Sequence, residues 1–204
     1  MKSLLLIGGG GHCHSCIDVI EATEIYQIKG LVQPKLSSEL ILGYPIIGSD
    51  DDLPKLLKDV KSALITVGQI KNSEIRIRLF DLLKQLGAEL PVIISPRAYC
   101  SKHAVLGEGL IVMHGAIITA SACIGNNCIV NSQALVEHDV EIDDHCHIST
   151  GARVNGNVTI GKGSFIGSGA IVREGIKVGE NVIIGAGQVV TQDVPNGTVV
   201  KHVE

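Results

Sequence analysis

The sequence ARVNGNVTIGKGSFIGSGAIVREG, residues 152–175, divides into four blocks of six with an aliphatic residue third in each block. The same division runs without insertion from residue 104 to residue 193, which makes fifteen blocks, and every third position is Leu, Val or Ile. The first position is Ala, Cys or Ser in nine of the fifteen. A constant period of this kind is typical of repeat architectures. We therefore expect a β-solenoid of about five triangular coils, each of eighteen residues, with the aliphatic side chains stacked along its axis.

The composition agrees with this expectation. Aromatic residues make up 2% of the chain, which has no Trp. Leu, Val and Ile, together with small neighbours, must therefore fill a narrow core. The net charge of −4 and the lack of a basic run argue against nucleic acid as a partner. The apolar run in MKSLLLIGGGGH, residues 1–12, is too short to cross a membrane and lacks a cleavage site. We expect a cytoplasmic protein whose six cysteines stay reduced.

Residues 1–95 follow a different pattern, in which strands and helices alternate. The apolar runs at 3–8 and 62–68 predict strands covered on both faces, and 29–33 predicts a short third strand. Helices are expected over 15–26, 51–60 and 72–87, the last with Asn72 and Ser73 as cap candidates and Gly87 after its end. The apolar run at 89–95 is expected to be the last segment of this α/β region. This alternation predicts a small Rossmann-like α/β domain at 1–95, followed by the solenoid at 96–204.

The stretch ALVEHDVEIDDHCHISTG, residues 134–151, has the appearance of a metal site. The six-residue register gives another interpretation, because Cys146 occupies the first position of its block, as Cys128 does eighteen residues earlier. Both should pack as small core residues. The three histidines avoid the aliphatic position and lack zinc-ligand spacing, so they can face outward and no metal is expected. We expect His145 to be a surface residue.

His138 is followed directly by Asp139. At a corner of the coil the chain turns, so that an acid there can reach the imidazole, fix its tautomer and raise its basicity, as a general base requires. The dipeptide alone is also compatible with an ordinary exposed pair.

The turn IGGGGHCHSC, residues 7–16, links the first strand to the first helix. Glycines in this place allow backbone N–H groups to hold a phosphate. The dinucleotide fingerprint fails, because Cys13 stands where its third glycine belongs and no acid ends the second strand. NAD is therefore rejected, and phosphate or nucleotide-sugar binding remains a candidate. Cys13 and Cys16 are interpreted as incidental cysteines.

Together, GGGGH (8–12), ITVGQIKNSEIR (65–76), VEHD (136–139) and HISTGARVNGNVTIG (147–161) resemble one bacterial family. It comprises the nucleotide-sugar acetyltransferases related to the bacillosamine-pathway and perosamine N-acetyltransferases and to the sialic acid O-acetyltransferases. The resemblance covers nearly the whole chain. It implies a left-handed parallel β-helix, a handedness that periodicity cannot supply.

The resemblance also implies partners and roles. It implies a homotrimer with acetyl-CoA in the groove between neighbouring β-helices and a nucleotide-sugar substrate. His138 corresponds to the general base and Asp139 to the acid that supports it. The other implied contacts are to acetyl-CoA, from His147, Ser168 and Ala186, and to the nucleotide-sugar, from Gly10, Gly11, His12 and Gly68.

Three departures from the family pattern stand out. Gln33 and Pro34 occupy the place of an acidic pair that contacts the nucleotide-sugar in relatives, and Asp139 replaces the longer Glu of the bacillosamine enzyme. The tail PNGTVVKHVE, residues 195–204, lacks the usual Gly-x-Pro-Ala ending.

These observations lead to one main hypothesis and two alternatives. The main one is acetyl-CoA-dependent N-acetylation of a nucleotide-linked dideoxy-aminosugar for surface-glycan synthesis, by direct attack of the sugar amine and with His138 as the base. The first alternative is O-acetylation of a sialic-acid-like sugar. The second is a β-helical scaffold or sugar-binding protein without turnover.

Overall fold

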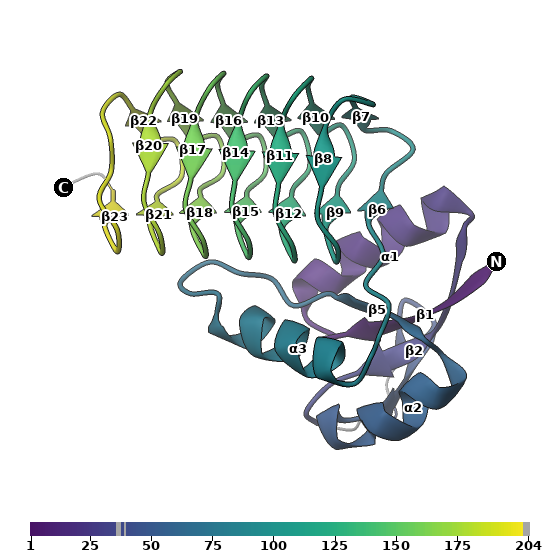
Figure 1. Cartoon of the computed structure of the whole chain (residues 1–204). Coiled ribbons are helices and arrows are strands. Elements are labelled where there is room, and N and C mark those ends of the chain that lie inside the picture. The colour runs from purple at the N-terminus through teal and green to yellow at the C-terminus, as the bar shows by residue number, and fades with distance from the viewer. Residues whose placement is uncertain (36–37, 39, 202–204) are drawn as a thin grey trace.

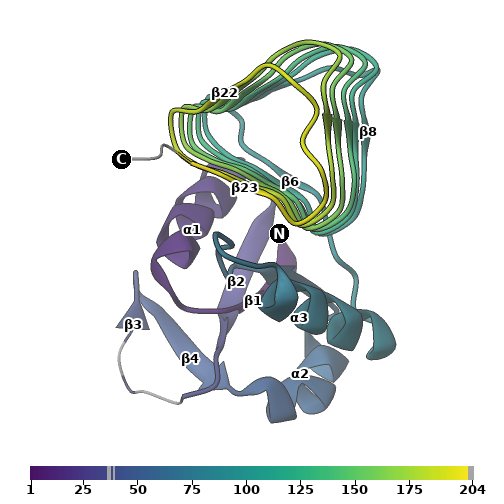
Figure 2. The ribbon, with the colours of Figure 1, turned by 90° about the vertical axis from the view of Figure 1, so that its left-hand side faces the viewer.

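The computed structural model describes residues 1–35, 38 and 40–201. It consists of an α/β domain beside a triangular β-helix, as Figure 1 shows from the side and Figure 2 along the axis of the β-helix. The last three residues of the tail noted above lie outside the described residues.

The N-terminal sheet has the order β3-β4-β2-β1-β5, parallel except for the β3–β4 pair. Its elements are β1 (Lys2–Ile7), α1 (Gly11–Thr23), β2 (Tyr26–Val32), β3 (Leu40–Ile41), β4 (Tyr44–Gly48), the 3₁₀ turn η1 (Asp50–Asp52), α2 (Leu53–Asp59), β5 (Ser62–Ile65) and α3 (Glu74–Gln85).

Strand β1 is buried on both faces, as its unbroken apolar run predicts. Leu4 and Leu6 pack with α1, whereas Leu5 and Ile7 pack with α2 and α3. The order of the strands reverses between β1 and β5, since β2 lies on one side of β1 and β5 on the other. Ligands of open α/β sheets bind at such a switch point, outside the carboxyl ends of the strands.

Several boundaries differ from the sequence prediction. Strand β2 begins at Tyr26 and not at residue 29, and β5 ends at Ile65 and not at residue 68. Helix α1 begins at Gly11 and ends at Thr23, because Glu24 takes a left-handed conformation (φ 55°) and Tyr26 already belongs to β2. The run 89–95 was expected to complete the α/β domain, but its strand β6 pairs with β9 and forms part of the β-helix. Short apolar runs carry no signal that distinguishes one sheet from another.

The β-helix has three faces, each a parallel sheet in which equivalent residues are eighteen apart, as for Ile117 and Leu135. Face 1 contains β6 (Ile93–Ile94), β9 (Ile111–Val112), β12 (Ile129–Val130), β15 (His147–Ile148), β18 (Phe165–Ile166), β21 (Ile183–Ile184) and β23 (Val199–Val200). Face 2 contains β7 (Tyr99–Cys100), β10 (Ile117–Ile118), β13 (Leu135–Val136), β16 (Arg153–Val154), β19 (Ile171–Val172) and β22 (Val189–Val190). Face 3 contains β8 (Val105–Leu106), β11 (Cys123–Ile124), β14 (Glu141–Ile142), β17 (Thr159–Ile160) and β20 (Lys177–Val178).

The six-residue register is confirmed. The third-position aliphatics fill the axis of the prism, with Cys128 and Cys146 among the residues packed beside them. The backbone N–H of Cys146 donates to Sγ of Cys128, 3.3 Å away, so the two cysteines stack one coil apart as predicted.

The sixth position of the blocks turns each corner in a left-handed conformation. The residues there with positive φ are Gly109, Gly115, Ser121, Asn127, Gln133, Asp139, His145, Gly151, Asn157, Gly163, Gly169, Gly175, Asn181 and Gly187. Glycine adopts this conformation without strain, and other residues pay about 1–2 kcal/mol. The corner between faces 1 and 2, the corner between faces 2 and 3 and the corner between faces 3 and 1 are called corners 1/2, 2/3 and 3/1 below.

Face 1 and corner 3/1 carry the N-terminal domain. Ile93, Ile111 and Ile129 of face 1 belong to the same hydrophobic cluster as α1 and β1. Figure 2 shows α1 and α3 lying under this side of the prism. The two halves therefore share a core, and the interface between them is a place where a site can form.

Candidate active site

A cavity of about 740 Å³ lies where the two domains meet. The loops that follow β1 and β5 form one wall, and residues of face 1 and corner 1/2 form the other. The lining residues are Gly8, Gly9, Gly10, Gly11, His12, Gln33, Pro34, Val67, Gly68, Gln69, Ile70, Ile75, Asn131, His147, Ser149, Phe165 and Ser168. The cavity thus occupies the switch point of the sheet and contains six of the nine residues singled out from the sequence.

The glycine turn leaves the start of α1 open to this cavity. Gly8 has a φ of +111°, and any Cβ there would clash with the side chain of Val67. Gly10 and Gly11 face open space instead. Gly10 caps α1 without a side-chain hydrogen bond, so the first N–H groups of the helix remain free for an anion.

His147 points into the cavity from β15. Its Nδ1 lies 2.7 Å from the carbonyl oxygen of Gln69, and its Nε2 lies 3.1 Å from Nδ2 of Asn131. A carbonyl only accepts, so Nδ1 carries the proton and Nε2 accepts from the amide. Burial lowers the pKa of His147 to about 4, against the hydrogen bond to Gln69 and with the help of the charge on Arg76. The ring is therefore neutral at physiological pH.

His12 lies on the opposite wall, at the first turn of α1, with its ring centroid 6.3 Å from that of His147. Burial lowers its pKa to about 3, and the charge of Arg76 and, when protonated, that of His147 contribute to this shift. Within the described part of the chain its Nε2 is buried without a hydrogen-bond partner. This nitrogen is enclosed by protein, so a ligand in the cavity could reach it only if the ring or its neighbours moved.

The prediction that His145 lies at the surface is wrong. It faces away from the prism axis, but α3 and the loop before it cover corner 3/1, and only 3% of His145 is exposed. Its Nδ1 pairs with Nδ2 of Asn127 at 2.9 Å, and its ring meets the edge of Phe80. The six-residue register distinguishes inside from outside, but it does not tell which outer surface another domain covers.

Arg76 and Gln69 connect the two domains, and sequence reasoning did not single out either of them. The guanidinium of Arg76 donates to the carbonyl oxygens of residues 65 and 67 and to both oxygens of Asn127. The side-chain amide of Gln69 donates to the carbonyl oxygens of His145 and Gly163. Both residues lie inside or next to the motif at 65–76, which was the available signal.

His138 lies at corner 2/3, away from the cavity, with its side chain 64% exposed. Its Nδ1 is 2.8 Å from Oδ2 of Asp139, as the turn was expected to allow. The pairing is made possible by the left-handed conformation of Asp139 (φ 59°), which directs the carboxylate back toward the ring. Since Nδ1–H donates to the carboxylate, Nε2 is left with a free lone pair.

The predicted residues therefore form two groups within one chain. Gly10, Gly11, His12, Gly68, His147 and Ser168 line the cavity at corner 1/2, where the hydroxyls of Ser149 and Ser168 are 3.0 Å apart. His138 and Asp139 lie at the other end of face 2. Ala186 is exposed on corner 1/2, one coil beyond Ser168, and does not line the cavity. A single chain does not bring the acid–histidine pair to the cavity.

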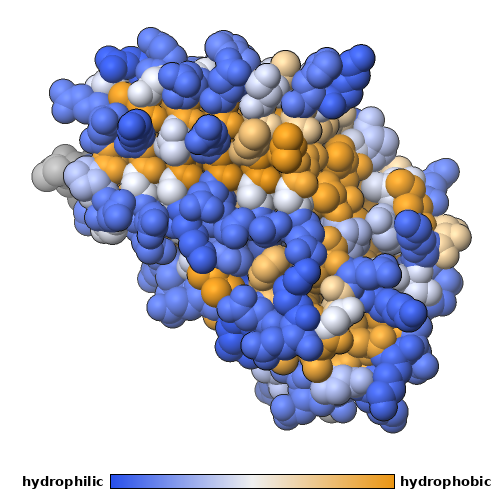
Figure 3. Space-filling view, in the orientation of Figure 1, coloured by the Kyte–Doolittle hydropathy of each residue, from blue (hydrophilic) through white to orange (hydrophobic). Residues whose placement is uncertain are grey.

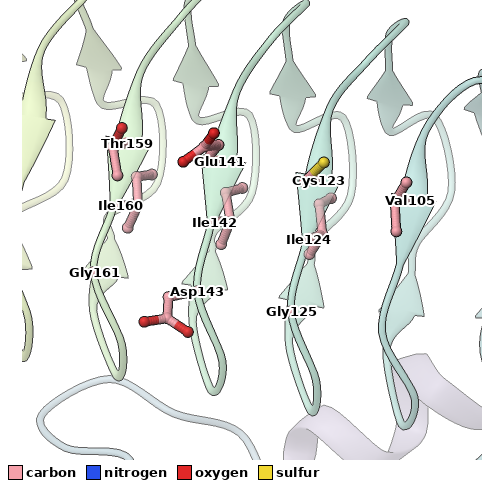
Figure 4. A pocket seen from close by; sticks show the side chains of 10 residues that line it. All are labelled: Val105, Cys123, Ile124, Gly125, Glu141, Ile142, Asp143, Thr159, Ile160 and Gly161. Atoms are coloured by element: carbon pink, nitrogen blue, oxygen red, sulfur yellow. The ribbon is translucent and has the colours of Figure 1, made fainter.

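A second, shallower hollow of about 400 Å³ follows the outer surface of face 3. Figure 4 shows that its floor is formed by Val105, Cys123, Glu141 and Thr159, one from each successive strand. In the space-filling view of Figure 3 this face is crossed by alternating apolar and polar rows. None of the described residues that line this hollow is a histidine. Among the described residues, no group of three or more His, Cys, Asp or Glu could hold a metal ion.

Comparison with known proteins identifies the family. The PglD N-terminal domain matches residues 3–83, and the hexapeptide repeat of succinyl-transferase matches residues 157–192. A histidine-to-asparagine variant of perosamine N-acetyltransferase from Caulobacter crescentus, in complex with CoA and GDP-perosamine, is 31% identical, with a TM-score of 0.92 over 98% of this chain and 93% of that one. This chain belongs to the hexapeptide-repeat nucleotide-sugar acetyltransferases.

Two further solved structures are similar. The acetyltransferase domain of PglB from Neisseria gonorrhoeae FA1090 is 34% identical, with a TM-score of 0.91 over 98% of this chain and 96% of that one, and it has also been solved with acetyl coenzyme A. WeeI from Acinetobacter baumannii AYE is 26% identical, with a TM-score of 0.87 over 98% of this chain and 97% of that one. No curated protein sequence matches the chain significantly.

Family membership decides two points that the residues alone left open. The β-helix is the left-handed one of this superfamily, and the chain is an acetyl-CoA-dependent acetyltransferase. In the part of the chain that the structure describes, no helix is both long and apolar enough to span a bilayer.

Proposed function

We propose that the enzyme transfers the acetyl group of acetyl-CoA to an amino group of a nucleotide-linked dideoxy-aminosugar, in the cytoplasm and for surface-glycan synthesis. The observation that carries this proposal is the hydrogen-bonded pair of His138 and Asp139, with Nε2 of the imidazole free. The similar enzyme from Caulobacter crescentus, whose structure contains CoA and GDP-perosamine, supports an amino-sugar as acceptor.

The pair supplies a direct mechanism. The sugar nitrogen attacks the thioester carbonyl carbon, and Nε2 of His138 removes a proton from that nitrogen as the new C–N bond forms. The C–S bond then breaks, and the imidazolium gives this proton to the departing thiolate, so that CoA leaves as the free thiol. Asp139 holds Nδ1–H throughout and stabilises the imidazolium. No covalent intermediate on the enzyme is required.

We propose that the active site is completed by a second copy in a homotrimer. Face 2 presents an outward row at the second position of its blocks, formed by Tyr99, Ile117, Leu135, Arg153, Ile171 and Val189. This row is apolar except for Arg153, whereas the row on face 3 includes Glu141, Thr159 and Lys177. Face 2 lies between the cavity at corner 1/2 and His138 at corner 2/3. Packing face 2 around a threefold axis would place His138 of one copy beside the cavity of the next.

The role of His138 is tested by His138→Ala. With thiol release from acetyl-CoA as the assay, and UDP-, GDP- and CMP-linked amino-sugars as acceptors, kcat should fall about 10²- to 10⁴-fold. His103→Ala is the matched control, because His103 is an exposed histidine on the same corner. An unchanged kcat in His138→Ala at saturating substrate would remove the general base from the mechanism. If thiol is released only with a sugar that offers a hydroxyl group and no amino group, the reaction is O-acetylation and the proposal of N-acetylation is wrong.

The trimer is tested by Ile117→Lys, which places a charge in the apolar row of face 2, where Ile117 is 42% exposed in the single chain. Light scattering should report monomers and the activity should be lost, while Thr159→Lys, at the same register position on face 3, should change neither. Mixing inactive His138→Ala with inactive His147→Ala subunits should restore part of the activity, because some sites then combine intact residues from two copies. Restored activity is not expected if each chain carries a complete site.

A further inference from the structure

Among the residues that the structure describes, the wall of the cavity carries no formal charge. None of these lining residues is Asp, Glu, Lys or Arg, and the two histidines among them, His12 and His147, are neutral at physiological pH for the reasons given above. A UDP- or GDP-linked sugar nevertheless brings a pyrophosphate with two negative charges. The free N–H groups at the start of α1 supply only a partial positive charge, equivalent to about half an elementary charge.

A full positive charge lies directly behind this wall. The side chain of Arg76 is 1% exposed, and it donates 2.7 Å to the carbonyl oxygen of Val67, a residue that lines the cavity. Its four acceptors are neutral, namely three backbone carbonyls and the side-chain oxygen of Asn127. Within the described residues no carboxylate lies at ion-pair distance from it.

Arg76 keeps its charge in this environment. Burial lowers its pKa to about 10, which still leaves the guanidinium protonated at neutral pH. Burying an ion without a counter-ion costs several kcal/mol even after relaxation, and hydrogen bonds to neutral oxygens offset only part of that cost. A neutral side chain could bridge the same carbonyls through donated hydrogen bonds, so the charge itself requires an explanation.

The field of this charge extends into the cavity. A charge surrounded by protein is screened far less than one in water, so it acts over several ångströms. The charge of Arg76 is among the causes that lower the pKa values of both His12 and His147, on opposite walls. Gln33 and Pro34, also on the wall, carry no charge.

We propose that Arg76 is a specificity-determining residue that makes the cavity selective for a pyrophosphate group without touching it. The charge stabilises the anionic ligand through the wall, while the N–H groups of the glycine turn make the direct contacts. The inference rests on the proposed function for the source of the pyrophosphate, which is the nucleotide part of the substrate.

The test is Asn127→Asp, which places a carboxylate oxygen where the Oδ1 of Asn127 lies, 2.6 Å from the guanidinium. The substitution neutralises the charge with little change in shape, and Asp tolerates the left-handed backbone of this position. It also removes the hydrogen bonds that join Nδ2 of Asn127 to the carbonyl oxygen of Arg76 and to Nδ1 of His145, so the two Arg76 variants described below are measured alongside it. Asn181→Asp is the matched control: it adds the same charge at the same corner and backbone conformation, three coils away and exposed. The probe is inorganic pyrophosphate at constant ionic strength, followed through the backbone amide resonances of Gly10 and Gly11.

We expect Asn127→Asp to raise the Kd for pyrophosphate about tenfold, and Asn181→Asp to leave it within about twofold. Equal affinity in the folded Asn127→Asp variant, an equal loss in Asn181→Asp, or no response of Gly10 and Gly11 in the native protein would overturn the inference. If Asn127→Asp does not fold, Arg76→Lys and Arg76→Met decide, since only the lysine variant should retain affinity. Acetyl transfer is measured separately, so that loss of the proposed function and loss of anion selectivity are distinguishable.

Discussion

At the scale of the residue, His138 is oriented by two neighbours of different origin. Asp139, the next residue, holds Nδ1, and the left-handed turn at Asp139 brings the carboxylate within reach. Gly156, one coil further on, lies against the ring: a Cβ there would be 2.7 Å from Cε1 and 2.8 Å from Nε2. The six-residue register identifies all three positions, but the contact between the ring and Gly156 requires the stacking of two coils.

Gly156→Ala should therefore displace the ring of His138, because the new methyl group would occupy the space next to Nε2. We expect kcat to fall about tenfold or more with little change in melting temperature, since no positive φ at Gly156 opposes alanine. Gly175→Ala provides the opposite signature. Its φ of +72° makes alanine strained, but no atom lies near the added methyl, so stability should fall and kcat should not. Steady-state kinetics and thermal unfolding of both variants provide the measurement.

At the scale of the element, each strand of the β-helix has only two residues, and its stability comes from the coils above and below. The glycines that follow the aliphatic position have a different function from those at the corners. At Gly161 a Cβ would lie 2.7 Å from the backbone of residues 179 and 180 in the next coil, so the coils can approach each other only because the side chain is missing.

Gly161→Ala should consequently destabilise the protein more than Gly175→Ala. The first substitution forces two coils apart and strains close packing, which typically costs about 1–3 kcal/mol or more. The second only places alanine in a left-handed conformation, at about 1–2 kcal/mol. Urea unfolding of the two variants measures the difference. Equal stabilities would show that the coils adjust to the added methyl group at no extra cost.

The sequence predicts the elements unevenly. Fifteen blocks carry one aliphatic residue each at the same position, so the inside of the prism could be assigned residue by residue. The sequence did not predict that β6 belongs to the β-helix or where α1 ends. A short apolar run is compatible with a strand of either sheet, and a Glu is compatible with both the inside and the end of a helix. The left-handed sixth position also escaped notice, since Gln, His and Ser occupy it alongside Gly and Asn.

At the scale of the whole molecule, the cavity and the network around Arg76 exist only where the two domains meet. His12 comes from the first domain and His147 from the second, and both are kept neutral by burial. Sequence patterns placed each residue in its own element. The buried position of His145 and the pairing of Arg76 with Asn127 depend on how the domains dock, for which a single sequence contains no periodic signal.

Docking should therefore weaken in acid. The pKa values of His147 and His12 are about 4 and about 3 in the folded protein, below the ordinary value of 6.5, so the unfolded chain binds protons that the folded one rejects. The stability is unaffected above pH 6.5 and falls as the pH drops from 6.5 toward 4. At pH 5 the loss should be on the order of 2 kcal/mol for each of these two histidines. Urea unfolding at pH 7 and pH 5 measures it, and His147→Gln should reduce the difference by about half.

The shared core also has a consequence for the order in which the protein matures. Synthesis proceeds from the N-terminus, yet the cluster around α1 includes Ile111 and Ile129, and Arg76 receives its last two acceptors from Asn127. A nascent chain of about one hundred residues thus exposes one face of α1, and its Arg76 has only two of its four hydrogen-bond acceptors. The first domain makes its full set of contacts only when the ribosome has delivered Gly163, whose carbonyl oxygen accepts from the side-chain amide of Gln69.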